Sequence, residues 1–238
     1  NQPDLIWNRQ WNNAQDWYVV DSSRGITANK YLNTNLSNAE ATLPQGNFTS
    51  VGATSVGISS GTWLNSTGSY YQMWMWRANG GTTSSDTSGN ITSVGQVDPS
   101  GCFSIFTYTG NGTAGATVAH HLNQAPDLMI FKERGNGNNW ITVAGTPYMN
   151  TRYLALDTTA QANTGFYGGG RTFSSSAGAS TFTLEGATEM NRSSGTYVSY
   201  GFSNCDGYIK IGEYVGNGDA NGPFSYTGFR PAMVIMKE

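Results

Sequence analysis

The stretch YTGNGTAGATVAHHLNQAPDLMIFKE, Tyr108–Glu133, recurs near the C-terminus as YVGNGDANGPFSYTGFRPAMVIMKE, Tyr214–Glu238. Its second half also opens the chain as PDLIWNRQ, Pro3–Gln10. The prolines that lead the three copies are 123 and 105 residues apart, a period the size of a small domain rather than of a solenoid turn. The chain is therefore predicted to be a slice through a tandem array.

The first two copies also align outside this stretch. Trp17 falls on Trp140 at the same spacing of 123 residues. Two longer segments match as well, Lys30–Thr42 with Arg152–Thr164 and Asn65–Trp76 with Asn191–Phe202. These matches predict a first unit over 1–77 that lacks its opening strands, a Gly/Ser/Thr/Asn-rich linker over 78–100, a complete unit over 101–204, and the opening strands of a further unit over 205–238.

Short alternating runs rich in Val, Ile, Thr, Tyr, Phe and Trp recur between clusters of Gly, Asn and Ser, while helical periodicity is nearly absent. This pattern is typical of many short antiparallel strands. We therefore predict an all-β protein of tandem antiparallel β-sandwich domains, jelly-roll or lectin-like. In Tyr71–Trp76, YQMWMW, neither alternating face is polar, so we expect this strand to be buried in a sandwich.

Composition excludes some classes of function. Charged residues make up only 11% of the chain, so a polar surface must rest on Ser, Thr, Asn and the 31 glycines. A net charge of −3 without a Lys/Arg cluster argues against binding to nucleic acid, which needs a basic surface. No apolar run approaches membrane-spanning length, so we expect no membrane insertion.

The two cysteines occupy different places in the repeat. The motif spacing of 106 residues puts Cys102 on Tyr208, and Cys205 has no cysteine counterpart. We therefore do not expect them to form a disulfide framework, which fits assembly in a reducing cytoplasm.

The aromatic residues divide into repeated and unrepeated positions. Trp17 and Trp140 repeat at the head of alternating strands, and we interpret them as core. Unrepeated aromatics in polar surroundings are better candidates for a recognition surface, because an exposed ring can stack on a sugar or anchor an interface. These candidate ligand-binding residues are Trp11, Trp63, Tyr148, Phe166 and Tyr167. The alternative is that these rings fold back over a small core.

No arrangement of residues predicts catalysis. His120 and His121, the only histidines, are adjacent on a predicted strand and so face opposite ways, and neither has a Cys or a third His at metal-ligand spacing. Glu185 and Glu189 carry the carboxylates a glycosidase needs, but the Gly-Ala-Thr between them is typical of a turn. We expect no enzyme activity, no cofactor and no metal.

Two further segments favour loop structure over chemistry. The Gly216–Gly222 and Asp86–Asn90 loops offer oxygen ligands suited to calcium, but they lack the spaced acids of a defined calcium loop, and turn formation is the simpler interpretation. Asp21 and Arg24 are close enough in sequence to pair and pin a loop.

The motifs, taken in order, resemble a domain repeat of virion structural proteins in tailed bacteriophages, particularly marine and cyanobacterial ones. The segments that carry the resemblance are Asp16–Gly25, Trp76–Glu133 and Gly207–Glu238. The resemblance implies a phage particle component of the tail-fibre, spike or surface-appendage class with lectin-like β-sandwich units, and it brings no catalytic residue. Family members often have glycine where this chain has His121, so His120 belongs to the pattern and His121 is particular to this chain.

With this resemblance, we expect a non-enzymatic virion structural protein that contributes to attachment at a host-surface glycan or protein through weak multivalent contacts. The expected partners are other virion proteins and further copies of the chain in a homo-oligomer. The expected location is the virion, assembled in the bacterial cytoplasm and then extracellular. Two alternatives stay open: an architectural capsid decoration or fibre spacer, and a carbohydrate-binding module of a secreted bacterial protein.

The incomplete units suggest a further hypothesis. The opening strands in 207–238 could dock on the back part, 1–77, of this chain or of a neighbour, because an incomplete sandwich leaves unpaired strand edges. Both segments contain the Pro-led strand, which counts against a simple fit. The alternative is that further sequence completes each unit.

Overall fold

The structure, a computed structural model, describes residues 1–144, 152–162, 177–185 and 188–237. It confirms the all-β prediction, since the described residues form antiparallel strands with a single turn of 3-10 helix, η1 (Ile26–Ala28), and one short helix, α1 (Thr188–Asn191). The strands of the first part are β1 (Leu5–Gln10), β2 (Tyr18–Asp21), β3 (Lys30–Asn33), β4 (Ala41–Thr42), β5 (Phe48–Val51), β6 (Val56–Ile58) and β7 (Tyr71–Trp76). Those of the second part are β8 (Ser84–Asp86), β9 (Ser93–Val97), β10 (Phe103–Thr109), β11 (Ala116–Ala119), β12 (Leu128–Glu133), β13 (Ile141–Ala144), β14 (Leu154–Ala155), β15 (Thr181–Leu184) and β16 (Thr196–Phe202).

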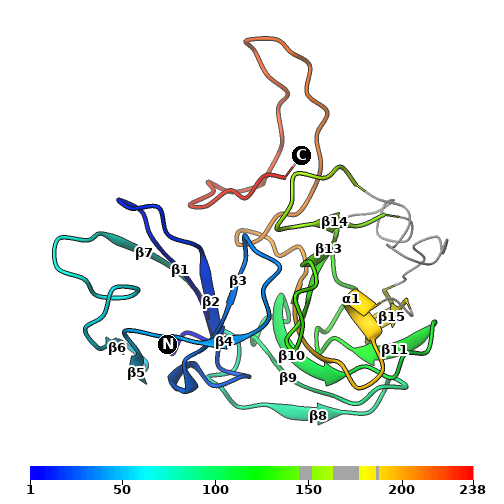
Figure 1. The fold of residues 1–238 in the computed structure, drawn as a ribbon. Coiled ribbons are helices and arrows are strands. Elements are labelled where there is room, and N and C mark those ends of the chain that lie inside the picture. The colour runs from blue at the N-terminus through cyan, green and yellow to red at the C-terminus, as the bar shows by residue number, and fades with distance from the viewer. Residues whose placement is uncertain (145–151, 163–176, 186–187, 238) are drawn as a thin grey trace.

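Two large sheets dominate the molecule (Figure 1). The first has the strand order β4-β3-β2-β1-β7 and the second the order β14-β13-β12-β16-β10-β9-β8. Two smaller sheets, β5-β6 and β11-β15, each contain two strands. Many strands that are consecutive in sequence are also neighbours in a sheet, as in the series β1, β2, β3 and β4.

The large sheets share a buried core between them. Along β10, Phe103 and Ile105 point to one side and join Leu5 and Val19 of the first sheet in one buried cluster, together with Trp140. Adjacent strand residues point to opposite sides of a sheet, so the intervening positions of β10 face away from the first sheet. The two sheets therefore pack face to face as in a sandwich.

The outer face of each large sheet is covered by a two-stranded sheet. On the second sheet, Phe106 and Tyr108 of β10 pack with Val118 of β11 and Phe182 of β15. On the first sheet, a second cluster joins its outer face to the β5-β6 sheet: Ile6, Val20, Ile26, Leu43, Phe48 and Leu64. The core therefore has three layers. One lies between the two large sheets, and each of the other two lies between a large sheet and the small sheet that covers it.

The repeat is also present in strand register. Leu5 of β1 lies opposite Trp76 of β7, and the equivalent Leu128 of β12 lies opposite Phe202 of β16. The pairing of β1 with β2 matches that of β12 with β13 in the same way, residue for residue. The two copies of the Pro-led motif therefore form the same strand in the same surroundings.

The segment 78–100 is not the linker that its composition predicts. It holds β8 and β9, which extend the second sheet beyond β10. The buried Gln96 side chain donates hydrogen bonds to the hydroxyls of Ser22 (2.7 Å) and Ser23 (2.9 Å) in the first part of the chain. Ser and Thr suit an outer strand whose second face is solvated, and this is why a linker composition here forms strands.

The strand over 71–76 is not buried as expected. Among the described residues β7 pairs with β1 alone, so it is the edge of the first sheet, and Met75 is 47% exposed. An apolar strand can lie at an edge, because the sequence pattern reports the polarity of its two faces and not the number of its neighbours.

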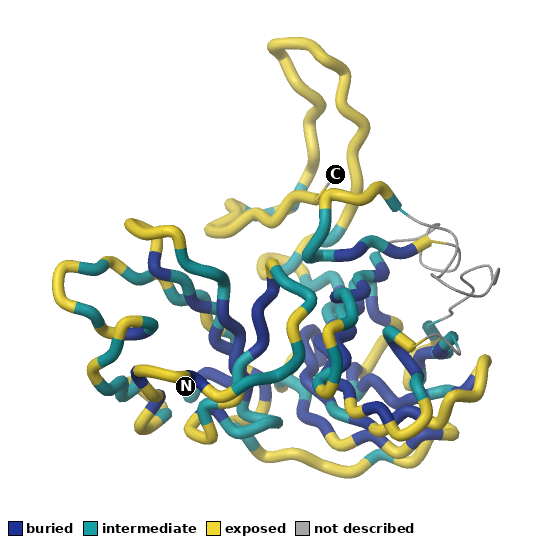
Figure 2. The backbone as a smooth tube through the Cα atoms, in the orientation of Figure 1, coloured by how far each residue is buried: buried dark blue, intermediate teal, exposed yellow. Residues whose placement is uncertain are grey.

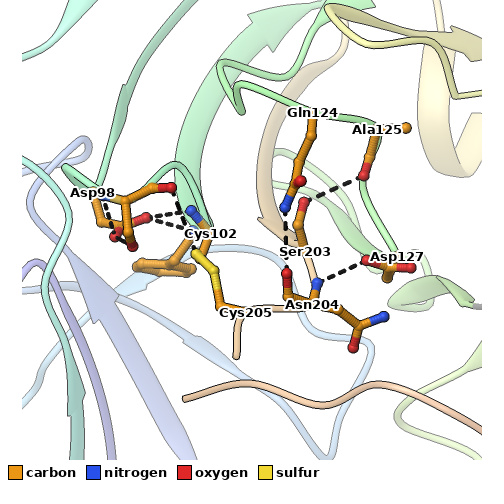
Figure 3. Close-up of a disulfide and its surroundings, with 10 residues drawn as sticks. Asp98, Cys102, Gln124, Ala125, Asp127, Ser203, Asn204 and Cys205 are labelled. Carbon is orange, nitrogen blue, oxygen red and sulfur yellow. Dashed lines mark hydrogen bonds between the residues drawn. A yellow bond between two sulfur atoms is a disulfide. The ribbon is translucent and has the colours of Figure 1, made fainter. Parts of the chain in front are cut away.

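Cys102 and Cys205 form a disulfide, which corrects the expectation from their repeat positions (Figure 3). Cys102 precedes β10 and Cys205 follows β16, and the antiparallel pairing of Phe103 with Phe202 brings these ends together. The Asp98 side chain holds the turn before β10 by accepting the backbone N–H groups of Cys102 (2.6 Å) and Phe103 (2.7 Å).

The segment after Cys205 extends from the body, and almost all of it is exposed (Figure 2). Its described residues, up to Lys237, form no strand, although the sequence predicts the opening strands of a further unit there. Large apolar side chains are exposed along it: Tyr214, Val215, Phe224, Tyr226, Val234, Ile235 and Met236. Strands need a partner for their backbone groups, and within the described chain the only strand pairing of this segment is an isolated bridge between Ile209 and Cys205.

A buried charge network joins the two sheets. The Arg24 side chain, 0% exposed, binds Asp21 at 2.6 Å, as the sequence predicts, and Glu40 at 2.8 Å. Glu40 also binds Arg134 at 2.9 Å, and the Tyr200 hydroxyl donates to Asp21 at 2.8 Å. Burial acts to lower the pKa of Arg24, but the carboxylates of Asp21 and Glu40, with Tyr200, outweigh it and raise that pKa.

Lys132 makes a second polar contact between the parts. Its ammonium group is buried and donates to the carbonyls of Ser37 (2.8 Å), Asn136 (3.3 Å) and Asn138. Burial lowers the pKa of Lys132 to about 8. Ser37 belongs to the first part of the chain, so this lysine ties a loop of one sheet to a strand of the other.

Candidate ligand-binding surface

Trp11 and Tyr70 form a pair of exposed rings at one end of the first sheet. Trp11 directly follows β1 and Tyr70 directly precedes β7, so the antiparallel pairing of these strands places them side by side. Their exposed fractions are 63% and 62%, and their ring centroids lie 5.4 Å apart with an interplanar angle of 34°. Two neighbouring aromatic rings open to solvent can contact the apolar face of a ligand.

Hydrogen bonds hold the two loops that carry this pair. The Trp11 N–H donates to the Tyr70 carbonyl (3.1 Å), and the Tyr70 N–H donates to Oδ1 of Asn12 (3.0 Å). Nδ2 of Asn12 donates to the Gly68 carbonyl (3.2 Å), and Nε2 of Gln10 donates to the Ser69 hydroxyl (2.9 Å). These hydrogen bonds fix the two loops, so less conformational entropy is lost when the rings bind a ligand.

The other predicted ligand-binding residues are placed differently. Trp63 is half-buried and packs over the outer cluster of the first sheet, with its ring centroid 4.6 Å from that of Tyr18. This is the packing role that the alternative interpretation predicts. Tyr148, Phe166 and Tyr167 lie outside the described residues.

A larger aromatic cluster on the first sheet was missed by the sequence analysis. Trp7 of β1, Trp74 of β7 and Trp17, directly before β2, form one cluster of rings. The rings of Trp17 and Trp74 are stacked at 4.7 Å between centroids. The Arg9 guanidinium lies 5.2 Å from the Trp17 ring, within range of a cation–π interaction. Trp140 is buried as expected, whereas Trp17 is half-buried. Alternation along each strand shows which residues share a face, but only the strand order brings these three rings together.

The two histidines serve local structure. His120 is buried, its Nδ1 accepts the Leu122 N–H (3.2 Å), and its Nε2 lies 3.1 Å from the Gly178 carbonyl. His121 has the left-handed φ of 62° and binds the Ser93 hydroxyl at 2.9 Å. Burial lowers the pKa of both rings. The left-handed backbone explains why glycine would suit the position of His121.

The described residues do not bring acidic side chains together in a catalytic or metal site. Glu185 follows β15 and Glu189 lies in α1, so the two carboxylates do not share a strand. Within the described ranges no group of three or more His, Cys, Asp and Glu residues is placed to hold a metal ion. In the part of the chain that the structure covers, no helix is long and apolar enough to cross a membrane.

Comparison with known proteins identifies one relationship. No curated protein and no solved structure matches this chain. The model of a domain of unknown function, DUF7483, matches residues 1–238. The chain therefore belongs to the DUF7483 family.

Proposed function

We propose that this chain is a non-enzymatic structural module of a tailed-bacteriophage particle, in a tail fibre, spike or surface appendage, that contributes to host attachment. The resemblance of its repeat to virion proteins supports the particle assignment. The observation that carries the attachment role is the exposed Trp11–Tyr70 ring pair on its hydrogen-bonded loops. Such a pair suits weak stacking on a surface glycan, strengthened when many copies bind together.

The disulfide favours a protein that works outside the cytoplasm. Disulfides persist in oxidising surroundings, and Cys102 and Cys205 are joined in this fold. This suits a released virion, where other virion proteins and further copies of the chain are the expected partners. It suits equally the alternative of a carbohydrate-binding module in a secreted bacterial protein. A purely architectural capsid decoration or fibre spacer is the third candidate, and it would not need the exposed rings.

A binding assay with beads separates these roles. The labelled chain is coupled at high density to beads and mixed with bacterial cells and with their extracted surface polysaccharide. We expect saturable binding that soluble polysaccharide competes, and a loss of at least tenfold in Trp11→Ala. Tyr226→Ala is the matched control, because it removes another exposed ring, 74% exposed against 63% for Trp11, far from the pair in sequence.

Each outcome bears on a different candidate. Equal binding by Trp11→Ala and the parent chain would contradict a role for the ring pair. No binding by the folded chain at any bead density would favour the architectural module. Binding to polysaccharide that is not restricted to one host, by a chain absent from purified particles, would favour the secreted carbohydrate-binding module.

A further inference from the structure

The outer edge of β7 is an unusual feature for a folded sheet. β7 is six residues of sequence YQMWMW, pairs only with β1 among the described residues, and exposes Met75 at its edge. An unpaired strand edge presents a row of free N–H and C=O groups that can pair with another strand. Natural proteins usually protect such an edge, so the free edge of β7 is a candidate site for the addition of another strand.

The complete unit shows which strand belongs there. β16, the counterpart of β7, has neighbours on both sides, since it pairs with β12 and also with β10. β12 and β1 are equivalent and pair in the same register, as Leu128 with Phe202 and Leu5 with Trp76. A strand equivalent to β10 is therefore the partner that would complete the edge of β7.

The chain carries a second copy of β10. The motif spacing of 106 residues aligns the seven residues of β10, Phe103–Thr109, with Ile209–Val215. This segment lies at the base of the extended C-terminal part, where Tyr214 is 57% and Val215 85% exposed, and it forms no strand. Within the described residues, the only strand pairing of Ile209–Val215 is an isolated bridge between Ile209 and Cys205, and β7 has a neighbour on one side only.

We propose that Ile209–Val215 of one copy of this chain adds as an antiparallel strand to the edge of β7 in a second copy. The disulfide at Cys205 anchors the segment beside the end of β10, and from there it runs away from β7 of its own molecule (Figure 1). The later Pro-led part, Pro231–Lys237, has no place on the acceptor, because β1 already occupies the equivalent position. Only Ile209–Val215 would therefore pair with β7 of the second copy.

The repeat fixes the register of the added strand. Transfer of the β10–β16 pairing puts Tyr214 opposite Tyr71, Gly212 opposite Met73 and Ile211 opposite Trp74.

The side chains fit this register. In the complete unit Tyr108 and Tyr197 stack at 4.9 Å, and the same pair recurs as Tyr214 with Tyr71.

At a second pair of facing positions, the large residue lies on the other strand. Phe106 faces Ser199 in the complete unit, whereas Gly212 would face Met73 in the added strand. One bulky and one small residue therefore share each position, which keeps the packed volume similar.

The backbone geometry supplies a matched pair of variants. The Gly110 N–H donates to the Gly195 carbonyl and the Ser203 N–H to the Cys102 carbonyl, so the even-numbered residues of β10 exchange hydrogen bonds with β16. The N–H of Gly212 would accordingly face β7, and that of Glu213 would face away. Gly212→Pro removes a hydrogen bond of the added strand, while Glu213→Pro places its proline on the outer side, where an edge strand tolerates it.

Sedimentation velocity over about a hundredfold range of concentration tests the association. We expect the parent chain and Glu213→Pro to associate with rising concentration, and the association constant of Gly212→Pro to fall at least tenfold. A monomer at all concentrations, or equal association of Gly212→Pro and Glu213→Pro, would overturn the proposal. The added strand would end with Val215 opposite Tyr70. The two proposals are still tested separately, because Gly212→Pro leaves the Trp11–Tyr70 ring pair unchanged and Trp11→Ala leaves Ile209–Val215 unchanged.

Cross-linking between copies tests the register. Glu213 would face Gln72, and both side chains are exposed, so Glu213→Cys in one copy and Gln72→Cys in another should join through a short thiol cross-linker. Gly212→Cys mixed with Gln72→Cys is one residue out of register and points to the opposite face. Equal yields from both mixtures would overturn the predicted pairing.

Discussion

Cys102 and Cys205 are joined across the end of the β10–β16 strand pair, with their Cα atoms 6.1 Å apart. The bond links residues separated by 103 positions, so it removes many conformations from the unfolded chain. We expect reduction to lower the free energy of unfolding by about 2–4 kcal/mol. Urea unfolding with and without a reductant measures this. The Cys102→Ala/Cys205→Ala double variant should not respond to the reductant, and an equal response in both proteins would contradict the prediction.

Arg24 holds together the charge network between the two sheets. Arg24→Met would leave the buried carboxylate of Asp21 without its positively charged partner, and we expect a loss of about 3–5 kcal/mol in the free energy of unfolding. Arg134→Met is the control, because the Arg134 side chain is 28% exposed and Glu40 keeps Arg24 as a partner. Its loss should be about 1 kcal/mol or less. Similar losses in the two variants would show that burial of the pair does not matter.

Replacement of Lys132 should lower the free energy of unfolding nearly as much as replacement of Arg24. Lys132→Met removes the donor to the carbonyls of Ser37, Asn136 and Asn138. A carbonyl that stays dry without a donor costs about 1–3 kcal/mol. We expect the urea midpoint to fall clearly, while Lys30→Met, at an exposed position, should change the free energy of unfolding by about 0.5 kcal/mol or less. An unchanged midpoint in Lys132→Met would mean that water reaches these carbonyls.

We expect His120 to make the fold less stable in mild acid. Its Nδ1 accepts the Leu122 N–H, which requires the neutral ring, and burial lowers its pKa below the ordinary value of about 6.5. The unfolded chain therefore binds the proton more readily, so stability should fall as the pH drops through about 6.5 towards the lower pKa of the folded state. Urea midpoints between pH 7.5 and pH 5.5 measure the effect.

The matching variant isolates this histidine. His120→Asn keeps a short acceptor without a titratable ring, so its midpoint should depend less on pH than that of the parent chain. Burial also lowers the pKa of His121, so the stability of His120→Asn should keep a weaker dependence on pH. The same pH profile in the parent and in His120→Asn would assign the acid sensitivity to other groups.

The sequence alone determined the strand type, the repeat and the face each strand residue occupies. Alternation in Phe103–Thr109 already separates Phe103 and Ile105 from Phe106 and Tyr108, because side chains point to opposite faces with a period of two. The repeat spacing likewise predicts that β1 and β12 occupy equivalent positions. The exposed ring of Trp11 was also predictable, since it has no repeated aromatic counterpart and lies among polar residues.

Only the tertiary structure decided which distant elements meet. The Cys102–Cys205 bond, the pairing of Trp11 with Tyr70, the contact of Arg24 with Glu40 and the open edge of β7 all depend on strand order. A local pattern records the polarity of a strand's two faces, but strand order is set by long-range pairing, which costs loop entropy and is rewarded only when the whole sheet forms.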